Sequence, residues 1–407
     1  MIAPMLLLET GCNFSSCYRA PCSRLSKVDM EITATSPARL GSLDMLRGIA
    51  IVGMVLVNNP GSWQHMFPLL RHAGWSGYTI ADLVFPFFLF AVGASQSFSL
   101  ADAAHTGRLP LHLFIRIVRR TVILFLLGIF LNALPGLLNE IFNGETYVIN
   151  NIRIMGILQR IAVVYFAAGI CIVFLSERLL WMTITLLLAG YWAVLAGFSG
   201  SLTPESNPAL FIDRLLLGAS HVYHGGLDPE GLFSSVSALA TALLGYTAGC
   251  FLRQGKGSRI ASGKLFAAGI IAIALGSLWG LWLPVCKDLW TGSYALISAG
   301  WAAAVFALCH EALKLPGGQR TGMPFLIMGR NALFLFVASG IVIRILLAVR
   351  LSIDGQEINI WFLLYDRLFA SWMGSNDISS FTLAACYLGA WWLVLNMMDR
   401  RSWRIKA

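Results

Sequence analysis

Long apolar runs separated by short polar segments dominate this chain. Ten runs each supply about 20 mostly apolar residues, which is what an α-helix needs to cross a hydrocarbon core of about 30 Å. They lie at about residues 43–60, 79–100, 120–138, 156–175, 179–198, 235–252, 265–283, 294–313, 325–346 and 379–398. A transmembrane β-strand would alternate apolar and polar residues, whereas segments such as 270–283 are apolar on every side. The pattern predicts an all-α polytopic membrane bundle of about ten helices, because the backbone in lipid must form its hydrogen bonds within each segment.

The composition agrees with a membrane protein and leaves little room for a soluble domain. Hydrophobic residues make up 57% of the 407 and charged residues only 12%, about half the charged share of a soluble domain. We therefore predict one membrane domain over residues 39–400, preceded by a tail at 1–38 and followed by a basic tail at 401–407. The opening residues show no periodicity, and one explanation is that translation starts at Met30.

The net charge of +9 admits two explanations, a nucleic-acid partner or the basic cytoplasmic loops of a membrane protein. Nineteen of the 29 Lys and Arg residues fall in the amino-terminal tail, in every second loop after it and in the carboxy-terminal tail. This bias predicts that both termini are cytoplasmic, and it removes the need for a nucleic-acid partner. The opposite loops are longer and carry most of the loop aromatic and acidic residues, so we expect function on the outer side.

One carboxylate stands out within the apolar runs. Asp82 lies at the outer end of the second run, and an ionisable group in hydrocarbon is costly unless it meets a partner or water. Pro86 cannot donate a hydrogen bond to the Asp82 carbonyl four residues back. We therefore expect a kink there that opens the helix beside a polar cavity.

The outer ends of the first two predicted helices bring candidate chemistry together. Asn58 and Asn59 end the first helix, and His72 closes the loop that leads to Asp82. A histidine is the usual general base near neutral pH, a carboxylate can orient it, and an amide can donate to an oxyanion. The set suits acyl transfer to an amine or hydroxyl. Taken one by one, a loop histidine also suits a surface and Asn-Asn-Pro-Gly a turn, so these residues alone leave a membrane enzyme or a transporter.

Metal and redox chemistry have little support. Five of the eight cysteines lie in or beside apolar runs, where a thiol packs as a small hydrophobe. Cys12, Cys17 and Cys22 are spaced too loosely for a zinc knuckle. His221 and His224 lack a third ligand, so no metal is expected.

Several separate motifs together resemble the heparan-α-glucosaminide N-acetyltransferase family and its bacterial relatives. The motifs are SLDMLRG at 42–48, VNNPG at 57–61, HAGWSG at 72–77, ADLVFP at 81–86, NIRIMGILQR at 151–160, DPEG at 228–231, LWTGSY at 289–294 and GRNAL at 329–333. They follow in order over roughly residues 38–400. The first motif alone is also similar to acyltransferase-3 membrane enzymes.

The resemblance implies a transmembrane acetyltransferase that takes acetyl from cytoplasmic acetyl-CoA and delivers it to the amine of a glucosamine-type sugar outside. The catalytic histidine of the family carries over onto His72, with Asn58 and Asp82 in the same site and Asn59 as an alternative amide. This chain lacks the large outer domain of the animal members, which indicates a bacterial inner-membrane enzyme for a smaller amino sugar. Alternatives are a glycan O-acyltransferase and a secondary transporter, although the inverted repeats typical of transporters are not visible.

Further binding roles follow from charge and position. The phosphates of acetyl-CoA need cations at the inner side, where Arg47, Arg330 and Asn331 are the candidates. The remaining acceptor-binding candidates are Asn59, Gln159, Arg160, Asp228 and Glu230, of which Gln159 and Arg160 equally suit a hydrogen bond that locks helices together. His72 either acts as a base in one step or is first acetylated. The expected partners are acetyl-CoA, an amino sugar or glycan, membrane lipid and, as one option, a second copy of the chain.

Overall fold

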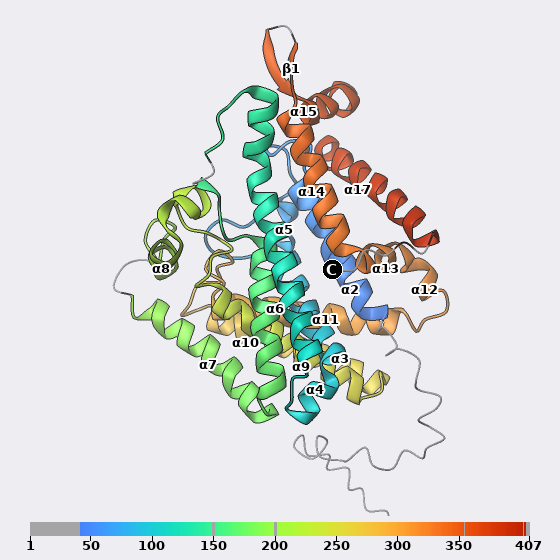
Figure 1. Cartoon of the computed structure of the whole chain (residues 1–407). Coiled ribbons are helices and arrows are strands. Elements are labelled where there is room, and N and C mark those ends of the chain that lie inside the picture. Colours follow the sequence, from blue (N-terminus) through green and yellow to red (C-terminus); the bar gives the residue numbers. More distant parts are fainter. Residues whose placement is uncertain (1–40, 149–150, 199–201, 354, 402, 404–407) are drawn as a thin grey trace, which may run out of the picture. The chain divides into compact units, whose positions relative to one another are not determined.

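The computed structural model describes residues 41–148, 151–198, 202–353, 355–401 and 403. The predicted tail at 1–38 and its three cysteines lie outside these residues. Figure 1 shows that the described chain is built mainly of helices, joined by loops and one short hairpin. The long helices are α2 (Gly41–Asn58), α3 (Ile80–Ser99), α5 (Leu111–Asn143), α6 (Ile157–Phe174), α7 (Glu177–Ala196), α9 (Ser235–Gln254), α10 (Arg259–Trp279), α11 (Gly292–Ala312), α14 (Ala332–Ala348) and α17 (Asp377–Arg400).

Short elements connect these helices. They are η1 (Pro68–Leu70), α4 (Ala101–Thr106), α8 (Pro208–Leu217), η3 (Ala219–His221), η4 (Tyr223–Gly225), α12 (Gly318–Thr321), α13 (Met323–Arg330), α15 (Ile360–Tyr365), η5 (Asp366–Ala370) and α16 (Ser371–Met373). A two-stranded antiparallel hairpin, β1 (Arg350–Ile353) with β2 (Gln356–Asn359), follows α14.

The helices confirm the predicted fold class. Within the described residues, nine helices are long and apolar enough to cross a membrane, and a bent pair gives a tenth span. Their centres match the ten apolar runs of the sequence. The chain is an all-α polytopic membrane protein.

The ninth predicted span was wrong in one respect, since it is not one continuous helix. The α13 and α14 helices meet at an angle of 80°, and Asn331 between them has φ −116° and ψ 25°. The α13 helix is pressed against α2, because a Cβ atom added to Gly329 would lie 1.7 Å from the carbonyl oxygen of Asp44. This close contact fixes the direction of α13, so the chain has to turn at Asn331 before α14 can cross.

Pro86 lies inside α3, which is one helix from Ile80 to Ser99. Pro86 has no N–H group to donate to the Asp82 carbonyl. That carbonyl instead accepts a hydrogen bond of 2.6 Å from the Tyr294 hydroxyl of α11. A buried carbonyl needs such a partner. The proline therefore provides an attachment point between α3 and α11, and the kink expected at Asp82 stays a prediction.

The α3 and α9 helices approach each other closely, which makes a specific prediction. A Cβ atom on Gly93 of α3 would lie 1.7 Å from the Ala242 carbonyl oxygen of α9, whereas one on Gly190 of α7 would meet nothing within 4 Å. We expect Gly93→Ala to lower the free energy of unfolding by about 1–3 kcal/mol. The matched Gly190→Ala should be neutral or stabilising, because alanine favours helix. Thermal unfolding in detergent measures both; equal melting temperatures for the two variants would contradict the close packing.

Candidate functional site

A polar cavity of about 330 Å³ lies where α3 begins, surrounded by the loops before α6, α9 and α11. Its lining residues are His72, Ala73, Gly74, Asp82, Arg153, Tyr223, Pro229, Glu230, Lys287 and Asp288. This volume is within the range of small-molecule binding sites. We call this the cavity end of the bundle, and the opposite end, where α2 and α5 begin, the basic end.

His72 and Asp82 form the centre of the cavity. His72 Nδ1 lies 2.7 Å from Asp82 Oδ1, so the ring donates from Nδ1 when the carboxylate is charged and leaves Nε2 as the acceptor. The Asp82 side chain is only 1% exposed, whereas that of His72 is 43% exposed. The carboxylate therefore orients a ring that faces the open cavity.

Lys287 completes this centre from a distant part of the chain. Its Nζ atom lies 3.1 Å from His72 Nδ1 and 3.4 Å from Asp82 Oδ1. The ammonium is thus an ion-pair partner of Asp82.

The second oxygen of Asp82 is held by the start of α3. Asp82 Oδ2 accepts from the backbone N–H groups of Ala73 and Thr79, both at 3.0 Å, and from the Thr79 hydroxyl at 3.2 Å. A carboxylate in the first helical turn is favoured by the unpaired N–H groups there. Local sequence therefore positions the carboxylate, and the carboxylate positions His72.

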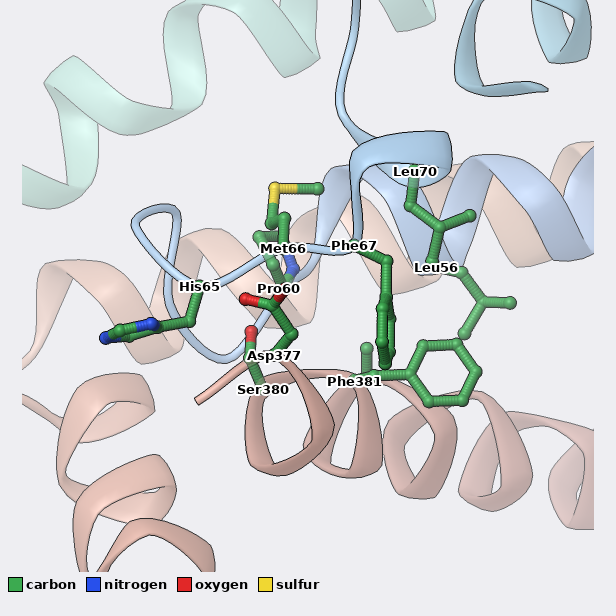
Figure 2. A pocket seen from close by; sticks show the side chains of 10 residues that line it. Leu56, Pro60, His65, Met66, Phe67, Leu70, Asp377, Ser380 and Phe381 are labelled. Carbon is green, nitrogen blue, oxygen red and sulfur yellow. The ribbon is translucent and has the colours of Figure 1, made fainter. Parts of the chain in front are cut away.

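The loop that carries His72 is anchored on α17. Ser62 N–H donates to the Ser380 hydroxyl at 2.9 Å, and the rings of Phe67 and Phe381 meet edge to face at 5.8 Å. Figure 2 shows Phe67 and Phe381 beside Leu56, with the His65 ring directed away from them. The space between these side chains is only about 10 Å³, so it is a packing contact and holds at most a single water.

Arg153 joins two carboxylates on the opposite wall of the cavity. It donates to Asp228 at 2.9 and 2.5 Å and to Glu230 at 2.5 Å. Burial alone would lower the pKa of Arg153, but its bond to Asp228 and the Glu230 charge raise it. Burial would likewise raise the pKa of Glu230, but the Arg153 charge lowers it. Asp228 is fully buried and does not line the cavity, so its contacts are those of a support for Arg153.

The segment before α11 presents Lys287 and Asp288 on a fixed turn. Trp290 N–H donates to the Lys287 carbonyl at 2.9 Å, and Thr291 N–H donates to the Cys286 carbonyl at 3.1 Å. Trp290 is buried with φ 49°, an unusual conformation for a residue other than glycine. Such strain persists only where the surroundings hold it, and it is frequent at functional sites.

Gln159 and Arg160 are not among the lining residues of the cavity. Arg160 is fully buried; it donates to the Ser234 hydroxyl and, at 3.2 Å, to the Gly231 carbonyl. Its guanidinium also lies 4.9 Å from the centre of the Trp290 ring. These contacts connect α6 with α9 and with the turn before α11, as expected for the helix-locking alternative. A role for either residue in acceptor binding stays a prediction.

Asn58 and Asn59 are also outside the cavity lining. Asn58 is exposed at the end of α2, and Asn59 is buried with its amide donating to the Val55 carbonyl at 2.7 Å. The structure thus brings His72 to Asp82 but gives neither asparagine a contact with them. Their proposed roles at the oxyanion and the acceptor stay predictions.

At the basic end, Arg47 and Arg330 meet at one buried carboxylate. Asp44 lies 3.6 Å from the Arg47 guanidinium and 3.9 Å from that of Arg330, which also lies 3.6 Å from Asp399. Asn331 is buried and donates to the Ile327 carbonyl at 3.3 Å. The three residues predicted to bind the cofactor therefore gather where α2 meets α13, and their role in binding it stays a prediction.

No group of three or more His, Cys, Asp or Glu side chains in the part of the chain that the structure describes is arranged to hold a metal ion. His221 instead uses Nδ1 on the Ile152 carbonyl at 2.8 Å. This histidine is a structural contact between two loops of the cavity end.

The sequence analysis missed three residues of the cavity wall, namely Arg153, Lys287 and Asp288. Arg153 was included only as part of a motif, and neither Lys287 nor Asp288 was among the predicted site residues. The available signal was their position within or directly before the NIRIMGILQR and LWTGSY motifs.

Together, the apolar helices and the His72–Asp82 cavity define a polytopic membrane protein with a polar site at one end of its bundle. Residues 39–230 match the family model described as "Heparan-alpha-glucosaminide N-acetyltransferase, catalytic". Over these residues the chain is similar to the heparan-alpha-glucosaminide N-acetyltransferase family.

Two curated relatives carry the name heparan-alpha-glucosaminide N-acetyltransferase. The Mus musculus protein is 29% identical over a region that covers 75% of this chain and 54% of the mouse protein. The Homo sapiens protein is also 29% identical, with 74% of this chain and 52% of the human protein covered. The chain thus spans about half the length of the curated relatives it matches.

Proposed function

We propose that this protein is a transmembrane N-acetyltransferase that moves acetyl from acetyl-CoA to the amine of a glucosamine-type sugar. One observation supports it above all, the 2.7 Å contact between His72 Nδ1 and Asp82 Oδ1 in a polar cavity of a chain similar to this family. The contact leaves Nε2 of the ring available to an acceptor in the cavity. A general base in hydrogen-bond reach of the acceptor is what amine acylation requires.

In the proposed reaction the neutral amine attacks the thioester carbonyl, and a C–N bond replaces the C–S bond. His72 takes the proton that the nitrogen loses and passes it to the departing thiolate, so the products are an amide and the free thiol of coenzyme A. Asp82 stabilises the imidazolium during the transfer. In the alternative two-step route, His72 Nε2 itself carries the acetyl group before the amine arrives.

The two ends of the bundle suit a donor inside and an acceptor outside. Loop arginines and lysines gather at the basic end, which the positive-inside rule places in the cytoplasm. In a bacterial inner membrane the cavity end would then face the periplasm. Asp44 and Asn58 lie fourteen residues apart on α2, or about 20 Å at 1.5 Å per residue, so the long pantetheine arm of acetyl-CoA would connect the two ends.

A transfer assay tests the proposal directly. Purified protein in nanodiscs is given acetyl-CoA and glucosamine, and free thiol and N-acetylglucosamine are measured together. We expect both products in equal amounts, dependent on both substrates. Release of neither product above the His72→Ala level would overturn the proposal, and an ester product cleaved by hydroxylamine would indicate O-acetylation instead.

The cluster at the basic end gives a separate prediction for the donor. We expect Arg330→Ala to raise the KM for acetyl-CoA by about tenfold or more, because the variant loses one charge-assisted hydrogen bond to a phosphate. The acceptor KM should stay unchanged. Arg320→Ala is the matched control, because Arg320 is an exposed arginine of the nearby α12. Equal KM values in the two variants would remove Arg330 from the donor site.

A further inference from the structure

The carboxylates at the cavity differ in whether a protein cation already occupies them. Asp82 is bound by His72, by two backbone N–H groups and by Lys287. Asp228 and Glu230 share the Arg153 guanidinium. Each of these three carboxylates already lies beside a cation of the protein.

Asp288 lines the same cavity but differs from these three. Among the described residues, none forms a hydrogen bond or an ion pair with its carboxylate. The ammonium of the adjacent Lys287 is directed to His72 and Asp82, 3.1 and 3.4 Å away. Asp288 therefore presents free acceptor oxygens to whatever enters the cavity.

The charge of the lining points to a cation. The carboxylates of Asp82, Glu230 and Asp288 face only two permanent cations, Arg153 and Lys287, so one negative charge is in excess when His72 is neutral. Burial, opposed by Lys287 and assisted by the charges of Glu230 and Asp82, raises the pKa of Asp288. A positive group beside Asp288 would relieve this cost, whereas a neutral group would not.

The backbone around Asp288 is fixed before any ligand binds. Cys286 N–H donates to the Thr291 hydroxyl at 3.1 Å, and the turn is closed by the bonds from Trp290 and Thr291 described above. Trp290 below it packs on Arg160. A carboxylate on such a rigid support loses little entropy on binding, which favours selective recognition.

We propose that Asp288 is the ammonium-binding residue of the acceptor site and selects a primary amine over a hydroxyl at the same position. The inference rests on the proposed function and deepens it by naming the group that recognises the acceptor in its ammonium form. The bound ammonium releases one proton to water, and the neutral amine that results loses a second proton to His72 as the C–N bond forms. Glucosamine meets this requirement, and glucose, with a hydroxyl in place of the amine, does not.

Binding without acetyl-CoA tests this separately from catalysis. Equilibrium dialysis of radiolabelled glucosamine and glucose, below the pKa of the amine, gives the ratio of their dissociation constants. We expect the wild-type protein to prefer glucosamine and Asp288→Asn to reduce that preference by about tenfold or more, as for one charge-assisted hydrogen bond. Asp288→Glu, which keeps the charge, should retain most of the preference.

Glu205→Gln is the matched control, since Glu205 is an exposed carboxylate outside the cavity lining. The preference of this variant for glucosamine over glucose should equal that of the wild type. A preference unchanged in Asp288→Asn, or absent from the wild type, would overturn the inference. Amine-selective binding that depends on Asp288 in a protein without transfer activity would support the inference and count against the proposed function alone.

Discussion

Replacing His72 with alanine is expected to lower the rate of acetyl transfer by about 10²–10⁴-fold, the usual contribution of a general base. The protein should stay folded, because Asp82 keeps its bonds to the Ala73 and Thr79 N–H groups and its ion pair with Lys287. Transfer rates and melting temperatures in detergent measure the two effects separately.

His65→Ala is the control for this variant. His65 belongs to the same loop but lies beside the packing contact on α17 shown in Figure 2. Its replacement should leave the rate within a few-fold of the wild type. Similar losses in both variants would mean that loop structure, and not the imidazole of His72, limits the reaction. Labelled acetyl-CoA given without acceptor distinguishes the two routes, since captured acetyl-histidine supports the two-step one.

Replacing Asp82 with asparagine should have a comparable effect for a different reason. Two backbone N–H groups point at Asp82 Oδ2, so the amide oxygen of asparagine has to take that position. The amide NH₂ then faces His72 Nδ1, which forces the ring into the form protonated at Nε2. That nitrogen can no longer accept a proton, and we expect a rate loss of about 10²–10⁴-fold.

Thr79→Ala separates catalysis from stability at this helix end. It removes the hydroxyl, whose single hydrogen is shared between the Arg71 carbonyl and Asp82 Oδ2, but keeps both backbone donors. We expect a loss of about 1 kcal/mol in unfolding free energy, with a rate within a few-fold of the wild type. If this variant loses as much activity as Asp82→Asn, the orientation of His72 is not what Asp82 contributes.

Much of the site was predictable where the residues are neighbours in the chain. His72 and Asp82 are only ten positions apart. Because Asp82 is a polar residue at the start of an apolar helix, the loop directly before that helix can fold back onto it. The asparagines show the limit of this reasoning. Asn58 and Asn59 end a helix at the same end of the bundle, but the direction of a side chain depends on packing, and Asn59 turns back to its own helix.

The sequence by itself determined the membrane spans, the helical class and the His72–Asp82 pair, because hydrophobic length and local spacing are properties of consecutive residues. Only the tertiary structure decided which distant charges complete the cavity: Lys287 reaches His72 across 215 positions, and Arg153 reaches Asp228 across 75. It also decided the bend at Asn331, which follows from the close approach of α13 to α2. A buried charge needs a partner. Which residue becomes that partner depends on how the helices pack and not on their order in the chain.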